Sequence, residues 1–202
     1  MELKVLMVDD HPPIIEGYRS ILADNSFGYI LNTTAVHSCE AAYKEVFQAK
    51  DPFDIVFVDT IHTREQVLAE LYFWANHLKE GGYFIFHDSH WEGPGDVIGG
   101  KQWERVDVAI TDFFGLPRSV REMNQYEDEN IRLEHYTPSY GMTFVQVKTL
   151  DAIEKFKSNI DWKEVFDIRN WLNDLHFNPK NPNFVDWNQD IDNIQNELII
   201  NP

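Results

Sequence analysis

FDIVFVD, at residues 53–59, is a mostly apolar run that closes on an acid. Two other stretches have the same form, KVLMVDD at residues 4–10 and YFIFHD at residues 83–88. Runs that are apolar on both faces are typical of strands buried inside a parallel sheet. We therefore expect three central strands of one sheet, each with an acidic residue at its carboxyl end.

Helix and strand signals alternate along the first three quarters of the chain. The remaining elements predicted there are a strand over residues 29–36, helices over 14–22, 39–49, 63–78 and 106–113, and a hairpin formed by 131–135 and 142–147. Strands that alternate with helices form parallel sheets with right-handed crossovers. The sequence thus predicts an α/β fold: a doubly wound, Rossmann-like or flavodoxin-like, mostly parallel sheet with an antiparallel C-terminal hairpin and a helical tail.

The domain organisation follows from a change in composition near residue 151. We expect residues 1–150 to form a single α/β domain and residues 151–202 to form a helical C-terminal appendage. The tail carries three tryptophans, Trp162, Trp171 and Trp187. Large aromatic side chains bury much apolar area, so we expect these to cover the sheet or a face between copies of the chain in a homo-oligomer.

The charge balance excludes several classes of partner. Seventeen Lys and Arg residues stand against 34 Asp and Glu residues, for a formal net charge of −17. Such a chain repels nucleic acid and anionic membranes, because phosphate contacts need basic side chains.

The single cysteine, Cys39, excludes a disulfide within the chain. No signal-peptide pattern and no long apolar run are present, and we expect a cytoplasmic protein.

Four acids are expected to gather at the carboxyl edge of the sheet: Asp9, Asp10, Asp59 and Asp88. Ligands of doubly wound sheets bind at this edge. Because hard divalent ions such as Mg²⁺ take oxygen ligands, the four acids are candidate metal ligands, with solvated loop carboxylates as the alternative. Without an ion, like charges held this close should raise one another's pKa.

Three histidines lie beside two of these strand ends. They are His62, His87 and His90. As a group they could bind a softer metal or act as a base. The alternative for each is an ordinary packing or hydrogen-bonding role.

The first 59 residues resemble the receiver domain of bacterial response regulators. VLMVDDHP at residues 5–12 and DIVFVD at residues 54–59 carry the resemblance. It implies that Asp9 and Asp10 bind Mg²⁺, that Asp59 is a phosphoacceptor, and that a histidine kinase is the partner. A receiver also needs a hydroxyl residue after the fourth strand and a lysine after the fifth. Ser89 and Lys148 are the nearest candidates, and both are displaced from the expected places.

Residues 53–148 instead resemble class I S-adenosylmethionine-dependent methyltransferases, through FDIVFVDTIHT at residues 53–63 and LKEGGYFIFHD at residues 78–88. Metal-dependent members bind a divalent ion through acids after these two strands. The resemblance implies Asp59 and Asp88 as metal ligands and catalytic residues with His62 beside them, S-adenosylmethionine as cofactor, and a small-molecule acceptor. The loop DDHPP at residues 9–13 lacks the glycines with which such enzymes bind that cofactor.

Three interpretations of function remain open at this point. The first is a metal-assisted, S-adenosylmethionine-dependent methyltransferase that lacks the usual Gly-rich cofactor loop. The second is a receiver-like phosphoacceptor module for signalling. The third is a folded chimera of the two, joined at residues 53–59, without catalytic activity.

Overall fold

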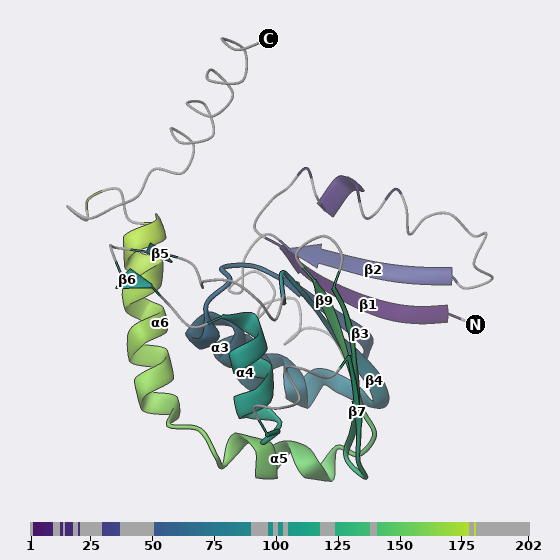
Figure 1. Ribbon diagram of the computed structural model, residues 1–202. Coiled ribbons are helices and arrows are strands. Elements are labelled where there is room, and N and C mark those ends of the chain that lie inside the picture. Colours follow the sequence, from purple (N-terminus) through teal and green to yellow (C-terminus); the bar gives the residue numbers. More distant parts are fainter. Residues whose placement is uncertain are drawn as a thin grey trace.

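The computed structural model describes residues 2–9, 13, 15–17, 20, 30–36, 51–89, 97–98, 101–102, 105–117, 124–137, 141–177 and 180. Seven strands form one sheet in the order β2-β1-β3-β4-β9-β8-β7 (Figure 1). These strands are β1 (Glu2–Asp9), β2 (Ile30–Val36), β3 (Phe53–Asp59), β4 (Leu78–His87), β7 (Gln125–Glu127), β8 (Ile131–Tyr136) and β9 (Met142–Val147). Two further strands, β5 (Val97–Ile98) and β6 (Lys101–Gln102), form a separate ribbon.

The strand directions confirm the predicted fold class. β1 pairs in parallel with β2 and β3, and β3 pairs in parallel with β4. β9 runs antiparallel to both β4 and β8, so β8 and β9 are the predicted hairpin. Because β1, β3 and β4 are neighbours in one sheet, the two segments on either side of residue 60 share a single core.

The described helices are α3 (Arg64–Trp74), the short 3₁₀ turn η2 (Ala75–His77), α4 (Val106–Phe113), α5 (Asp151–Lys157) and α6 (Trp162–Phe177). The start of α3 agrees with the predicted helix 63–78, because Thr63 caps it: the Thr63 hydroxyl accepts a hydrogen bond from the Gln66 N–H at 3.4 Å. Of the predicted helix 14–22, residues 15–17 and 20 are described and helical, whereas the predicted helix 39–49 with Cys39 lies outside the described residues.

The glycine pair at residues 81 and 82 has a different role from the predicted one. A glycine pair just after a predicted helix, here 63–78, is expected to end that helix. In the structure α3 gives way to η2 earlier, and β4 already begins at Leu78. Gly81 has a φ of 78°, and the β3–β4 register shifts beside it. A Cβ atom on Gly82 would lie 2.8 Å from the Lys79 carbonyl oxygen and 2.9 Å from that of Asp54. The two glycines therefore allow an irregularity inside β4.

The two faces of the sheet pack against different parts of the chain. Alternate strand residues such as Leu6, Val56 and Phe84 belong to the main core, which includes residues of α3 and α4. Met7 and Phe57 point to the opposite face, where they pack with Ile15. Figure 1 shows α3 and α4 next to each other, and they cover the main-core face.

Helices α5 and α6 close the main core from outside. The ring of Phe156 in α5 lies 5.2 Å from that of Phe114, and the ring of Trp162 in α6 lies 4.7 Å from that of Tyr72 in α3. Trp171 is 44% exposed, so it does not share in this packing to the same extent. Trp187 lies outside the described residues.

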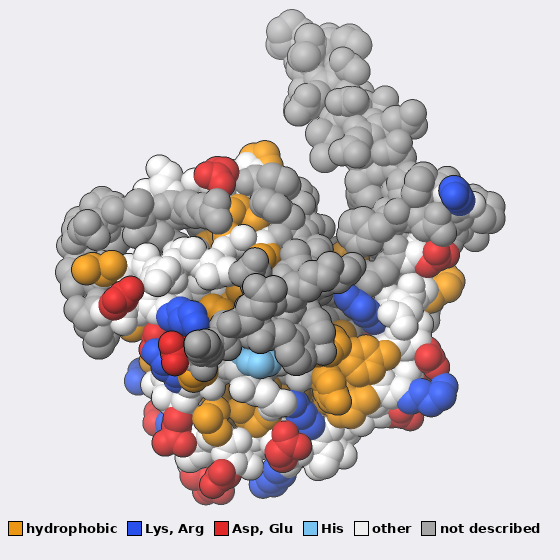
Figure 2. Space-filling model, turned by 180° about the vertical axis from the view of Figure 1, so that it is seen from behind, with side chains coloured by type: hydrophobic (Ala, Val, Ile, Leu, Met, Phe, Trp, Pro, Cys, Tyr) orange, Lys and Arg blue, Asp and Glu red, His pale blue; other side chains and the backbone are white. Residues whose placement is uncertain are grey.

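The described helices were compared with the requirements of a membrane crossing. None of the helices among the described residues combines the length and the apolar character that a bilayer crossing requires. On the face shown in Figure 2, acidic and basic side chains lie interspersed among the described residues and do not separate into one basic field.

Candidate functional site

Three acidic residues meet at the carboxyl edge of the central strands. Asp9 ends β1 and is paired in register with Asp59, which ends β3. Asp88 follows directly after β4, the other neighbour of β3. Asp9 is fully buried and Asp59 is 8% exposed. The strand register places Asp9 beside Asp59, but the group of side chains that could share a metal ion contains Asp59, His62 and Asp88 and not Asp9. Asp10 lies outside the described residues.

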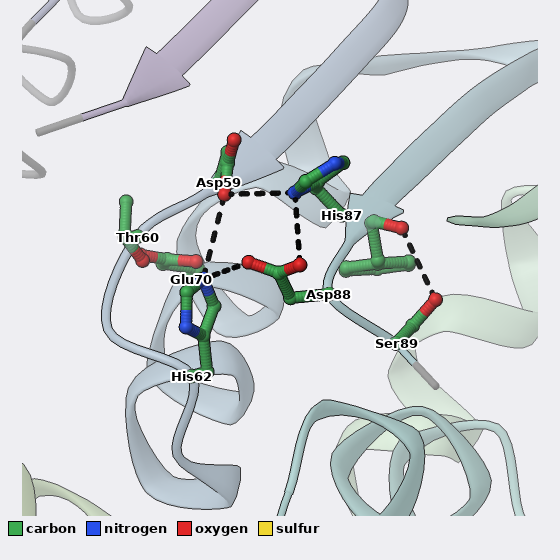
Figure 3. A network of polar contacts seen from close by, with 8 residues as sticks. Asp59, Thr60, His62, Glu70, His87, Asp88 and Ser89 are labelled. Atoms are coloured by element: carbon green, nitrogen blue, oxygen red, sulfur yellow. Dashed lines mark hydrogen bonds and ion pairs between the residues drawn. The ribbon is translucent and has the colours of Figure 1, made fainter. Parts of the chain in front are cut away.

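Two histidines lie between the carboxylates of Asp59 and Asp88 (Figure 3). The Nε2 atom of His62 is 3.4 Å from Asp59 Oδ1 and 2.9 Å from Asp88 Oδ2. The Nδ1 atom of His87 is 3.5 Å from Asp59 Oδ1 and 3.3 Å from Asp88 Oδ1. His90, the third predicted histidine, lies outside the described residues.

These imidazoles reverse the expected electrostatics of the acids. Burial alone would raise the pKa of Asp59 and Asp88, but hydrogen bonds and charge from His62 and His87 lower both pKa values. The hydrogen bond to Asp59, followed by that to Asp88, raises the pKa of His87 to about 10. The expectation of raised carboxyl pKa values is therefore wrong for these two acids, because cationic partners separate them.

The donor set fits a divalent metal ion. One ligand atom each from Asp59, His62 and Asp88 can be chosen so that all three lie within 4.8 Å of one another. Ligands at about 2.1 Å from a metal in adjacent coordination positions are roughly 3 Å apart. The distances of His62 Nε2 to its two carboxylate partners, 2.9 and 3.4 Å, are close to that spacing.

The loop that carries His62 is anchored behind the site. The Thr60 hydroxyl donates to Glu70 Oε1 at 2.5 Å, and the Gln66 amide donates to the same atom at 2.7 Å. Glu70 is 1% exposed and belongs to α3. Neither Thr60 nor Glu70 was predicted from the sequence. A signal for Thr60 was present, because Asp59 and Asp88 are each followed directly by a hydroxyl residue.

The residues that a receiver would need do not reach this site. Ser89 is fully buried, and its hydroxyl contacts Thr143 at 2.7 Å. Lys148 follows β9, which is antiparallel to β4, so it lies at the opposite edge of the sheet, where it donates to Glu127 at 2.6 Å. The displacement of both residues from the phosphoacceptor position is therefore present in the fold as well as in the sequence.

A comparison with protein families points the same way. Residues 3–89 match a family model described as "Methyltransferase domain". The match begins inside β1 and continues through β4, so it includes the stretch that resembles a receiver. A receiver–methyltransferase chimera is not supported, because one family describes both sides of the proposed join. No curated protein matches the chain.

Three solved structures to which parts of this chain are similar are methyltransferases by their descriptions. The MycE methyltransferase of the mycinamycin biosynthetic pathway, in complex with Mg and SAH, has 15% identity and a TM-score of 0.44, over 75% of this chain and 46% of MycE. The SAH-bound Podospora anserina methyltransferase PaMTH1 has 13% identity and a TM-score of 0.36, over 72% of each chain. A putative O-methyltransferase from Klebsiella pneumoniae has 12% identity and a TM-score of 0.36, over 72% of this chain and 73% of that one. The chain thus spans under half the length of MycE.

The sequence supports a site for S-adenosylmethionine less well than it supports a metal site. Residues 10–13 read DHPP and contain no glycine, the residue type that allows a cofactor to approach the backbone closely. Among the described residues, β1 ends at Asp9, whose side chain is fully buried. The sequence after β1 therefore lacks the glycines of the usual S-adenosylmethionine-binding loop, and binding of this cofactor has to be tested directly.

Proposed function

We propose that this chain is a methyltransferase-type domain that holds a divalent metal ion at Asp59, His62 and Asp88 and acts on an oxygen of a small-molecule acceptor. The observation that carries the proposal is the convergence of these three side chains at the edge of β3 and β4. The family match over residues 3–89, which includes all three, supports the methyltransferase part. S-adenosylmethionine is the expected methyl donor on the strength of that match alone.

The roles of the chain's own residues follow from their contacts. Asp59 and Asp88 supply carboxylate oxygens, and His62 supplies the Nε2 atom that already faces both. His87 contacts both carboxylates from the other side and holds them in place. A bound divalent ion polarises a coordinated oxygen and lowers the pKa of a bound hydroxyl.

The phosphoacceptor interpretation is weaker on specific grounds, and the non-catalytic one is separated only by experiment. Phosphorylation of Asp59 would compete with its contacts to two imidazoles, and neither Ser89 nor Lys148 is placed to bind a phosphoryl group. A domain that binds metal without catalysis keeps the same site and differs only in whether it binds the methyl donor.

Calorimetry on the full chain separates these possibilities. S-adenosylmethionine is titrated into the protein with and without Mn²⁺, using wild type, Asp59→Asn and Asp54→Asn. Asp54 is a matched control, because it belongs to the same strand but pairs with Lys79 at 2.8 Å, away from the site. We expect wild type and Asp54→Asn to bind the donor.

The absence of heat at millimolar S-adenosylmethionine in wild type would exclude the methyltransferase assignment. A domain that still bound Mn²⁺ under those conditions would retain the metal site without the methyl-transfer function. A mass increase after treatment with a small phosphodonor and Mg²⁺, lost in Asp59→Asn, would instead favour the phosphoacceptor interpretation.

A further inference from the structure

A buried chain of three polar side chains runs from the candidate metal site across the sheet. Ser89 Oγ lies 2.7 Å from Thr143 Oγ1, and Thr143 Oγ1 lies 2.8 Å from His135 Nδ1. Ser89 and Thr143 are fully buried, and His135 is 7% exposed. The chain therefore links the residue after Asp88 to β9 and then to β8.

The protons of this chain can be assigned by counting donors. The Ser89 hydroxyl donates its one proton to the Phe86 carbonyl oxygen at 3.2 Å. Its contact with Thr143 must then be one in which Thr143 donates, because a hydroxyl has a single O–H. Thr143 has no second proton to offer, so the Nδ1 atom of His135 must be the donor in the last contact. The order of donation is His135, Thr143, Ser89, Phe86.

The hydrogen-bonded series of Ser89, Thr143 and His135 is tied to the backbone next to Asp88. Ser89 also donates its backbone N–H to the Gly141 carbonyl oxygen at 3.4 Å. Between Phe86 and Ser89 stand His87 and Asp88, and Asp88 has a φ of 50°, in the left-handed region that costs a side-chain-bearing residue energy. A conformation of that kind persists only where its surroundings hold it.

We propose that Ser89, Thr143 and His135 are positioning residues, which hold the turn at His87 and Asp88 so that the Asp88 carboxylate faces His62 and Asp59. This inference rests on the proposed metal site. None of the three residues contacts the candidate ligand atoms directly, so their effect passes through the backbone of the turn. Residues that orient metal ligands in this way typically change metal affinity by about 10- to 100-fold when they are removed.

The test compares two buried threonines. Thr143→Val removes the central hydroxyl of the chain and keeps the shape of the side chain. Thr111→Val is the control, because Thr111 is 1% exposed and, among the described residues, its hydroxyl donates to the carbonyl oxygens of Asp107 and Val108 within its own helix, α4. Mn²⁺ affinity is measured by calorimetry and folding by thermal melting. Thr143→Ser, which retains the hydroxyl, is the rescue variant.

We expect Thr143→Val to weaken Mn²⁺ binding about 10- to 100-fold, while Thr111→Val binds as wild type and Thr143→Ser recovers the affinity. Equal Mn²⁺ affinity in Thr143→Val and Thr111→Val, with similar losses of melting temperature, overturns the inference and leaves the metal site standing. Wild type that binds no Mn²⁺ overturns both.

A second measurement does not depend on any variant folding. Nitrogen-15 NMR of the wild-type histidines reports which ring nitrogen of His135 carries a proton. We expect a protonated Nδ1. An Nδ1 atom without a proton breaks the order of donation and overturns the inference.

Discussion

His62 Nε2 lies 2.9 Å from Asp88 Oδ2, across the gap between the ends of two neighbouring strands. The same atom lies 3.4 Å from Asp59, so one imidazole bridges two carboxylates that belong to different strands. Parallel strands place their carboxyl ends at one edge, and a short loop before α3 returns His62 to that edge. The metal-site proposal depends on this bridge.

Replacing Asp59 should destabilise the protein in the absence of metal. A cluster of bare carboxylates would gain stability from Asp59→Asn through lost repulsion, but here the Asp59 carboxylate accepts contacts from His62 and His87. We expect a loss of about 1.5–3 kcal/mol, the range for hydrogen bonds to charged groups. Urea unfolding in the presence of a chelator measures it.

Asp51→Asn is the control for this experiment, because Asp51 is exposed and its contact with Lys4 uses the backbone carbonyl. It should change the unfolding free energy by less than about 0.5 kcal/mol. An Asp59→Asn protein more stable than wild type would show that carboxylate repulsion dominates the site after all.

Asp54 should make the stability depend on pH at the other edge of the sheet. Burial raises its pKa, but the Lys4 N–H and the Lys79 ammonium outweigh burial and lower the pKa below the ordinary value of 3.8. A lowered carboxyl pKa stabilises the fold above the unfolded value, and the stabilisation is lost as the pH falls through the folded pKa.

Asp54→Asn should therefore be less stable than wild type at neutral pH, by about 1 kcal/mol. The difference should shrink as the pH falls below 3.8. Thermal melts of the two proteins over a pH series measure it. A difference that stays constant through this range would show that the ionised carboxylate makes no net contribution.

The glycine pair in β4 offers a test of the fold. Gly82→Ala would place a Cβ atom under 3.0 Å from two carbonyl oxygens, so we expect a loss of about 1–3 kcal/mol. Gly17→Ala is the matched control, since no described residue lies within 4 Å of its Cβ position and residue 17 is helical. It should stabilise by about 0.4–1 kcal/mol. Equal effects in denaturant unfolding would contradict the close approach at Gly82.

Most of the sheet could be predicted because its central strands are apolar on both faces. Runs such as 53–59 have few other ways to be buried, and the acids that close them fix the edge at which a site forms. The irregularity at Gly81 could not be predicted in the same way. A glycine after a helix is usually a C-cap, and only the pairing of β3 with β4 requires these two inside a strand.

The sequence indicated some of the side chains that meet at this edge but not their electrostatics, and the predicted metal ligand Asp9 is not in the group that could share an ion. Asp59, Asp88 and His62 stand out as polar residues at strand ends, whereas the bridging contacts depend on side-chain positions that spacing does not determine. The buried partners Glu70, Thr143 and His135 were missed for a related reason. Each lies far from the site in sequence or inside an element, and only the fold brings it near.

The most direct test of the metal site is a calorimetric titration of Mn²⁺ into the metal-free protein, repeated with Mg²⁺. The site combines carboxylates with an imidazole. This ligand set suits Mn²⁺ better than Mg²⁺, which prefers oxygen ligands alone. We predict one Mn²⁺ site per chain that binds more tightly than Mg²⁺, is lost in Asp88→Asn and is retained in Asp54→Asn. No Mn²⁺ binding in wild type, or equal binding in Asp88→Asn, would contradict the account.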